Sequence, residues 1–119
     1  MAMKTGTNMQ LQIPKYILVF INNLFEIQKK LNLNGDSINI KRNVLKMIEC
    51  LEDMGITFED PLGQPFSQTR SDLDASISGE GIDDLIVVDV LKPIIRAGTS
   101  NVSTVIQKGV VVVESKSKE

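Results

Sequence analysis

The chain has 119 residues, a formal net charge of −2 and no histidine. The missing histidine excludes Ser–His–Asp and Cys–His catalytic arrangements and histidine-based metal sites. It also removes the side chain most often used for acid–base catalysis near neutral pH. One cysteine, Cys50, cannot form an internal disulfide or a cysteine-rich zinc site. Carboxylates and lysines remain available for catalysis, but we predict a protein that is not an enzyme and holds no cofactor or metal.

Charge and hydropathy also narrow the range of partners. No basic face is visible that could neutralise several phosphates, so we predict no nucleic acid partner. The longest apolar run near the start, Tyr16 to Ile21, is far shorter than the roughly 20 residues of a membrane-spanning helix. We therefore predict no membrane partner. No signal peptide is recognised, and a single cysteine suits a reducing compartment, so a cytoplasmic location is expected.

Residues 1–12 are polar and lack periodicity, and we interpret them as a flexible lead-in. Pro14 then opens a predicted helix, because the N–H that proline lacks has no partner in the first helical turn anyway. Apolar residues recur along this helix at three- and four-residue steps, which places them on one face. They are Ile17, Phe20, Ile21, Leu24, Ile27 and Leu31. The turn residues from Asn32 to Gly35 end the helix.

A second predicted helix follows, with Asp36 or Ser37 as its cap and Gly55 as its C-terminal stop. Its apolar stripe consists of Ile40, Val44, Met47, Ile48, Leu51 and Met54. We expect Cys50 on this helix to be a buried structural side chain. Residues 13–55 are thus predicted to form an antiparallel helical hairpin.

Two helices of this length cannot fully cover each other's apolar faces. A second hairpin would complete the cover in a homodimeric four-helix bundle, whereas in a monomer the β segment would have to fold back onto the helices. Each fully buried Leu, Ile or Phe contributes about 1.5–3 kcal/mol, and a chain this small buries a limited fraction of its surface alone. We therefore favour the homodimer. The residues predicted at its interface are Phe20, Leu24, Ile27, Leu31, Val44, Ile48 and Leu51.

From residue 56 to residue 115 the hydrophobic period changes from helical to alternating. This change predicts a small, mostly β domain and an α+β fold class for the chain. The predicted strands are Leu73–Ile77, Asp84–Leu91, Val102–Gln107 and Gly109–Glu114, with a loop from Ala97 to Asn101. The Val110–Val113 run is typical of a strand buried on both faces. Residues 116–119 form a polar tail.

An acidic loop in this segment has a partial calcium-binding pattern. Asp72 and Asp74 alternate with other residues, and Asp83 lies eleven residues after Asp72. An EF-hand loop needs glycine at its sixth position, where Ile77 stands here, and it needs flanking helices where we predict strands. A solvated acidic loop is therefore favoured over a metal site.

The most specific pattern is the junction after the second helix. The helix ends at Met54-Gly55-Ile56, and the chain continues through Glu59-Asp60-Pro61-Leu62-Gly63-Gln64-Pro65-Phe66. The prolines forbid helix continuation, and Gly63 permits a tight turn. This junction resembles the corresponding segment of the GrpE family of chaperone nucleotide-exchange factors. Further similar segments are Phe20–Leu24, Val88–Lys92 and Val105–Val113, so that the resemblance covers about Ile13 to Ser115.

The resemblance implies a homodimer built on a four-helix bundle, followed by a compact β domain. In that family one β domain inserts against the nucleotide-binding domain of a DnaK-type chaperone, holds a lobe open and lets ADP leave. Such a factor performs no bond chemistry, because it acts by preferring the open state of its partner. The residues that the resemblance places at the partner surface are Leu91, Arg96, Gly98, Asn101 and Thr104.

The chain departs from the family pattern in several places. Family members usually carry a long helical stalk before the bundle, whereas only a short segment precedes the first predicted helix here. Thr104 stands where the family often has arginine, and the Gly98–Ser103 loop is longer than usual. These departures keep an alternative open, namely a divergent protein-interaction or adaptor module with a GrpE-like fold and no exchange activity.

Overall fold

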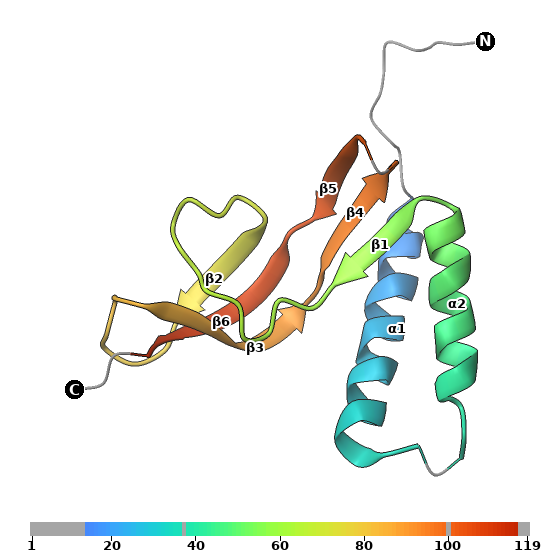
Figure 1. Cartoon of the computed structure of the whole chain (residues 1–119), viewed down its shortest axis with the longest axis horizontal. Coiled ribbons are helices and arrows are strands. Elements are labelled where there is room, and N and C mark those ends of the chain that lie inside the picture. Colours follow the sequence, from blue (N-terminus) through green and yellow to red (C-terminus); the bar gives the residue numbers. More distant parts are fainter. Residues whose placement is uncertain (1–13, 37, 100, 117–119) are drawn as a thin grey trace.

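The computed structural model describes residues 14–36, 38–99 and 101–116. These residues form two helices followed by six strands (Figure 1): α1 Lys15–Asn34, α2 Lys41–Asp53, β1 Ile56–Glu59, β2 Leu73–Ile77, β3 Leu85–Lys92, β4 Ile94–Gly98, β5 Ser103–Gln107 and β6 Gly109–Ser115. The predicted α+β class is therefore confirmed. The predictions made for residues 1–12 and for the end of the tail lie outside the described residues.

Helix α1 begins and ends close to its predicted limits. The N–H of Ile17 donates to the carbonyl of Pro14 at 2.9 Å, which starts the first turn. The helix ends at Gly35, which has a φ of 85° and a ψ of 175°. This backbone conformation is essentially restricted to glycine, so Gly35 is a favourable helix terminator.

The N-cap residue of helix α2 is Ile40, whereas Asp36, one of the two predicted caps, binds the start of the helix from four residues upstream. Its Oδ1 accepts the N–H of Ile40 at 2.7 Å, and its Oδ2 accepts the N–H of Lys41 at 3.0 Å. The carboxylate therefore satisfies donors that have no partner within the first helical turn. Ser37, the other predicted cap, lies outside the described residues.

The strands form two three-stranded sheets, in the orders β1-β4-β5 and β2-β6-β3. Strand β4 pairs antiparallel with both of its neighbours, whereas β6 pairs parallel with β2 and antiparallel with β3. Strands β1 and β4 were not predicted, and the loop predicted to start at Ala97 is wrong there, because β4 continues through Gly98. In β4 the adjacent residues Ile94 and Ile95 belong to two different core clusters. Both faces of β4 are therefore covered, so it lacks the alternation that identifies a half-buried strand.

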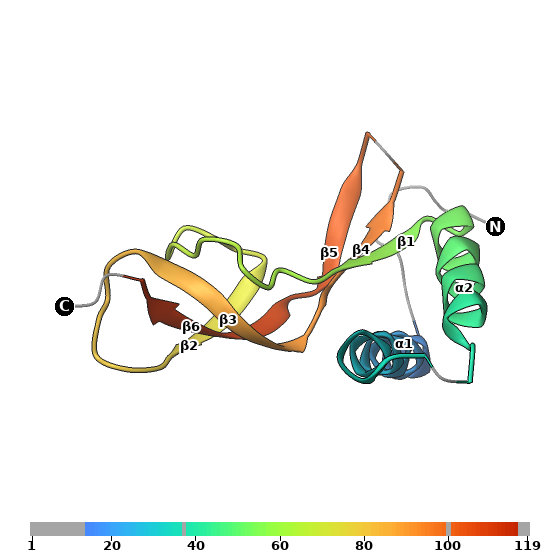
Figure 2. The same cartoon turned by 60° about the horizontal axis from the view of Figure 1, so that its bottom comes forward.

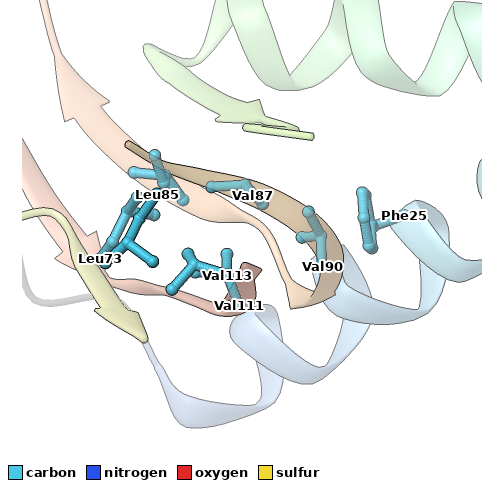
Figure 3. Packing of buried hydrophobic residues seen from close by; sticks show 8 residues of the cluster. Phe25, Leu73, Leu85, Val87, Val90, Val111 and Val113 are labelled. Carbon is cyan, nitrogen blue, oxygen red and sulfur yellow. The ribbon is translucent and has the colours of Figure 1, made fainter. Parts of the chain in front are cut away.

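The larger core cluster lies on the β2-β6-β3 sheet and reaches α1 (Figure 3). Its buried members are Phe25, Leu73, Leu85, Val87, Val90, Ile94, Val111 and Val113. The prediction that β6 is buried on both faces is wrong in part, since Val111 and Val113 are buried while Val110 and Val112 are half-buried. Strand β6 lies between two neighbours in its sheet, but only one of its faces packs on this cluster.

The second cluster joins both helices to the β1-β4-β5 sheet. It contains Ile21, Leu24, Val44, Leu51, Ile56, Ile95 and Ala97. The β segment therefore covers part of the apolar helical faces within one chain. The axes of the two helices cross, since Figure 2 shows α1 nearly end-on while α2 is still seen from the side. Crossing helices pack over a limited area. Cys50 is exposed on α2, so its predicted burial is wrong: it lies outside the stripe of Val44 and Leu51 that faces this cluster.

Candidate functional site

The β4–β5 hairpin is the most prominent exposed feature near the predicted partner residues. Figure 2 shows its tip projecting from the molecule. The turn is closed by a hydrogen bond from the N–H of Thr99 to the carbonyl of Val102 at 2.8 Å. Gly98 has a φ of 139°, and a Cβ atom at this position would lie 2.9 Å from the Cα of Ser103, so the turn requires glycine. Val102 beside the tip is 68% exposed.

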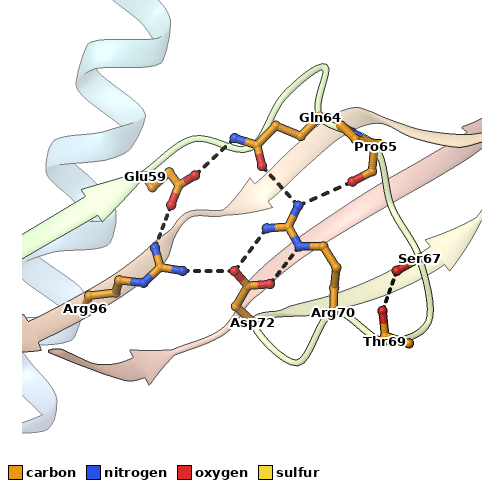
Figure 4. Close-up of polar contacts among 8 residues, drawn as sticks. All are labelled: Glu59, Gln64, Pro65, Ser67, Thr69, Arg70, Asp72 and Arg96. Carbon is orange, nitrogen blue, oxygen red and sulfur yellow. Dashed lines mark hydrogen bonds and ion pairs between the residues drawn. The ribbon is translucent and has the colours of Figure 1, made fainter. Parts of the chain in front are cut away.

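A polar network connects this hairpin to the segment that links the two sheets (Figure 4). The guanidinium of Arg96 on β4 donates to Glu59 Oε1 at 2.6 Å and to Asp72 Oδ2 at 2.9 Å. Arg70 binds the same Asp72 carboxylate with two hydrogen bonds of 3.0 Å. Gln64 connects Glu59 to Arg70, because its side-chain amide donates to Glu59 and accepts from Arg70. Strand β1, the connection between β1 and β2, and strand β4 are thereby held together.

The network changes the acidity of its two carboxyl groups. Hydrogen bonds from Arg70, together with its positive charge, lower the pKa of Asp72 below its usual value of 3.8. For Glu59, the hydrogen bond from Gln64, followed by the interaction with Arg96, lowers the pKa below 4.5. Both groups are therefore ionised near neutral pH, and neither is suited to act as a general acid or base there.

A reciprocal amide pair fixes β5 against α1. The side-chain amide of Asn22 donates to Gln107 Oε1 at 3.0 Å, and that of Gln107 donates to Asn22 Oδ1 at 3.0 Å. Gln107 also donates to the carbonyl of Pro93 at 3.1 Å. These half-buried contacts hold the base of the hairpin in one position relative to the helix.

The structure brings together most, but not all, of the predicted partner-binding residues. Gly98, Asn101 and Thr104 lie within one hairpin, where Thr104 is exposed opposite Ala97. Leu91 is 53% exposed on β3, in the other sheet, and precedes the end of β4 farthest from the hairpin tip. Arg96 is near the tip, but its guanidinium is occupied by two carboxylates.

The predicted dimer residues fall into three groups. Leu24, Val44 and Leu51 are between 2% and 4% exposed, and they pack in the core of the single chain. Leu31 and Ile48 are half-buried. Phe20 and Ile27 are 45% and 40% exposed. These two residues are therefore the members of the set that a second chain could cover directly.

Two hollows lie near these residues. One of about 330 Å³ adjoins the hairpin and is lined in part by Arg96, Thr57 and Ser103, but the Arg96 cation is already paired. Another of about 300 Å³ lies between α1 and β3, with Phe25 and Val88 among its lining residues.

Within residues 14–36, 38–99 and 101–116, no group of three or more acidic or cysteine side chains could hold a metal ion. In the same part of the chain no helix is long and apolar enough to cross a membrane.

Sequence reasoning missed the polar network. Most of its members lie between Glu59 and Asp72, but Arg96 is 37 positions from Glu59 and 24 from Asp72. No local spacing indicates that Arg96 meets the others. A partial signal was available, because Glu59 and Gln64 both stand in the junction segment that carries the family resemblance.

A scan against models of known protein families, a search of curated proteins and a search of solved structures found no match to this chain.

Proposed function

We propose that the chain is a homodimeric, GrpE-like nucleotide-exchange factor that binds a DnaK-type chaperone and promotes release of ADP. The observation that carries this proposal is the β4–β5 hairpin, which carries the exposed residues Asn101 and Thr104 beside the half-buried Gly98. These are three of the five residues that the family resemblance assigns to the partner surface. The order of two helices followed by a β unit is also the order that the resemblance implies.

The proposed dimer forms through a helical hairpin of α1 and α2, which would join a second copy in a four-helix bundle. Exposed apolar side chains on α1 support this assembly. Tyr16, Phe20 and Ile27 are spaced by four and seven residues and therefore lie on one face of the helix. Their exposed fractions are 79%, 45% and 40%. Covering such a stripe with a second copy would remove apolar surface from water.

Release of fluorescent ADP from a DnaK-type chaperone tests the proposed activity. We expect the release rate to rise with the concentration of this protein and to saturate. Thr104→Lys places a charge on the exposed side of the hairpin and should change the concentration of half-saturation, whereas Ile82→Lys in the exposed β2–β3 connection should not. An unchanged release rate at saturating concentration, with the chaperone from the source cell, would contradict exchange activity.

One observation favours the alternative of an adaptor without exchange activity. Residues 97–107 contain no charged side chain, and the adjacent Arg96 is engaged by Glu59 and Asp72. A charged contact at Thr104 is therefore missing from the hairpin. Chaperone binding without faster ADP release would support the adaptor and contradict the exchange factor.

A further inference from the structure

The outer edge of β5 is open along the hairpin. In the sheet order β1-β4-β5, strand β5 is an edge strand, and no other strand of the described chain pairs with its outer side. An edge strand presents unpaired N–H and C=O groups that can bind another extended chain. The exposure of Ser103, Thr104 and Val105 keeps this edge accessible.

The hydrogen-bond pattern identifies which backbone groups face outward. Thr99 and Val102 are directly opposite and hydrogen-bonded to each other, at 2.8 Å. Opposite pairs in an antiparallel ladder alternate between hydrogen-bonded and non-hydrogen-bonded. The pairs Gly98–Ser103 and Arg96–Val105 are therefore of the second kind. The Gly98 N–H is consistent with this alternation, because it points away from β5 and donates to the carbonyl of Gly55 at 2.8 Å. The backbone groups of Ser103 and Val105 thus point away from β4.

The other edge strands differ from β5 in charge or in cover. Strand β1 contains Glu59 and strand β2 contains Asp74, and charges on an edge discourage strand addition. Strand β3 contains charged residues too, and part of its edge is covered, because the N–H of Gly63 donates to Val87 O and that of Val87 donates to Gln64 O, both at 2.9 Å. Strand β5, with the sequence Ser-Thr-Val-Ile-Gln, has no charge, no proline and no such cover among the described residues.

We propose that the outer edge of β5 binds an extended, uncharged segment of a partner protein by strand addition. The amide pair of Asn22 and Gln107 holds this edge in place before binding, so little conformational entropy is lost at the site. Backbone hydrogen bonds would provide the binding energy, and the exposed side chains of Val102 and Val105 would contact the added strand.

A partner segment is favoured over a second copy by the position of β5 on α1. Asn22, which contacts β5, is two residues from Phe20, so these side chains point about 200° apart around the helix. The face proposed for dimerisation is therefore turned away from β5. The edge of β5 would stay open in that dimer.

The experiment is a titration of the isotope-labelled full chain with the peptide acetyl-Thr-Val-Thr-Val-Thr-amide, followed by NMR. This peptide is uncharged and rich in β-branched residues, which favour the extended conformation. We expect saturable shifts and slower hydrogen exchange at the amides of Ser103 and Val105. The same peptide with every amide N-methylated has no backbone N–H to donate, and its methyl groups block the close approach of two strands, so it should leave these amides unchanged.

Val105→Pro removes an outward N–H and should weaken peptide binding by about tenfold, which is the order expected for the loss of one hydrogen bond. Val105→Thr keeps the N–H and the branched shape, and it should bind like the unmodified chain. Ser103→Pro is the second variant. The side-chain amide signals of Asn22 and Gln107 report whether the hairpin has stayed in place in each variant.

Several outcomes would overturn the proposal. These are peptide shifts confined to other residues, equal binding of the N-methylated peptide, or exchange at Val105 that is already slow in the free chain. Shifts at Ser103 and Val105 that depend on protein concentration without peptide would assign the edge to a second copy instead. The titration needs no chaperone, so the two proposals can fail separately. Faster ADP release without peptide binding would contradict only strand addition, whereas peptide binding without faster ADP release would contradict only the exchange function.

Discussion

At the scale of single residues, Asp72 is the centre of the contacts that hold the two sheets together. Its carboxylate accepts hydrogen bonds from Arg70 and Arg96, and its side chain is only 18% exposed. Arg70 offers two parallel donors to it, a geometry that is stronger than a single hydrogen bond. Removal of the charge would leave two half-buried guanidinium groups with weaker partners.

We therefore predict that Asp72→Asn lowers the free energy of unfolding by about 1–3 kcal/mol at neutral pH, as expected for hydrogen bonds to charged groups. Urea denaturation measures this change. Asp74→Asn is the matched control, because the side chain of Asp74 is 66% exposed and its only ion pair among the described residues is a long one, 3.8 Å from Oδ1 to Lys108 Nζ. That substitution should change stability by no more than about 0.5 kcal/mol. Equal effects of the two substitutions would show that the network does not stabilise the fold.

The same network predicts a direction for the pH dependence. The folded pKa values of Asp72 and Glu59 lie below their usual values of 3.8 and 4.5. The stabilisation is therefore complete only well above pH 4.5, and it is lost as the pH falls below the usual values through the folded pKa. The difference between the unmodified chain and Asp72→Asn should shrink on acidification to pH 3. A difference that stays constant from pH 7 to pH 3 would contradict this assignment.

At the scale of elements, the junction between α2 and β1 depends on the close approach of two glycines. Gly55 has a φ of 82°, and a Cβ atom there would lie 2.9 Å from the carbonyl oxygen of Gly98. The N–H of Gly98 also donates to the carbonyl of Gly55. The end of the helix is thereby tied to the end of β4, next to the hairpin tip.

Gly55→Ala should destabilise the fold more than Gly63→Ala does. Gly63 is the matched control, because its φ of 84° is nearly the same but no atom lies within 4 Å of an added Cβ. The control carries only the strain of a positive φ, about 1–2 kcal/mol, whereas at Gly55 the contact with Gly98 must also open. Thermal unfolding of both variants measures the difference. Equal losses of thermal stability in the two variants would mean that the approach of Gly55 to Gly98 is not tight in solution.

The sequence predicts elements best where the hydrophobic period is regular. The spacing from Ile17 to Leu31 predicts α1, and the alternation from Leu73 to Ile77 predicts β2. Strand β4 escapes this reasoning because Ile94 and Ile95 are buried on opposite faces. The Arg96 contacts escape it too, since their partners become neighbours only after the sheets form. The hairpin residues of the candidate site follow from the resemblance, but the open edge of β5 follows only from the strand order.

At the scale of the whole molecule, burial within one chain limits which residues can test the proposed dimer. Leu24 is 2% exposed and packs in the cluster that contains Ile95. A charge at Leu24 would unfold the single chain and would say nothing about assembly. Phe20 and Ile27 are exposed on α1, so a charge there should leave the fold of one chain intact.

We predict that the double substitution Phe20→Asp and Ile27→Asp converts the proposed dimer to a monomer, because each charge would be buried without a partner in the interface. Sedimentation velocity at micromolar concentration measures the mass, and circular dichroism checks that both helices are retained. Ile82→Asp is the control, because Ile82 is 73% exposed in the connection between β2 and β3, away from the helices. If the double variant sediments as a dimer, the stripe on α1 is not the interface. If the unmodified chain sediments as a monomer, the four-helix bundle is wrong, and the packing of the β segment on the helices is then the only cover that the helices need.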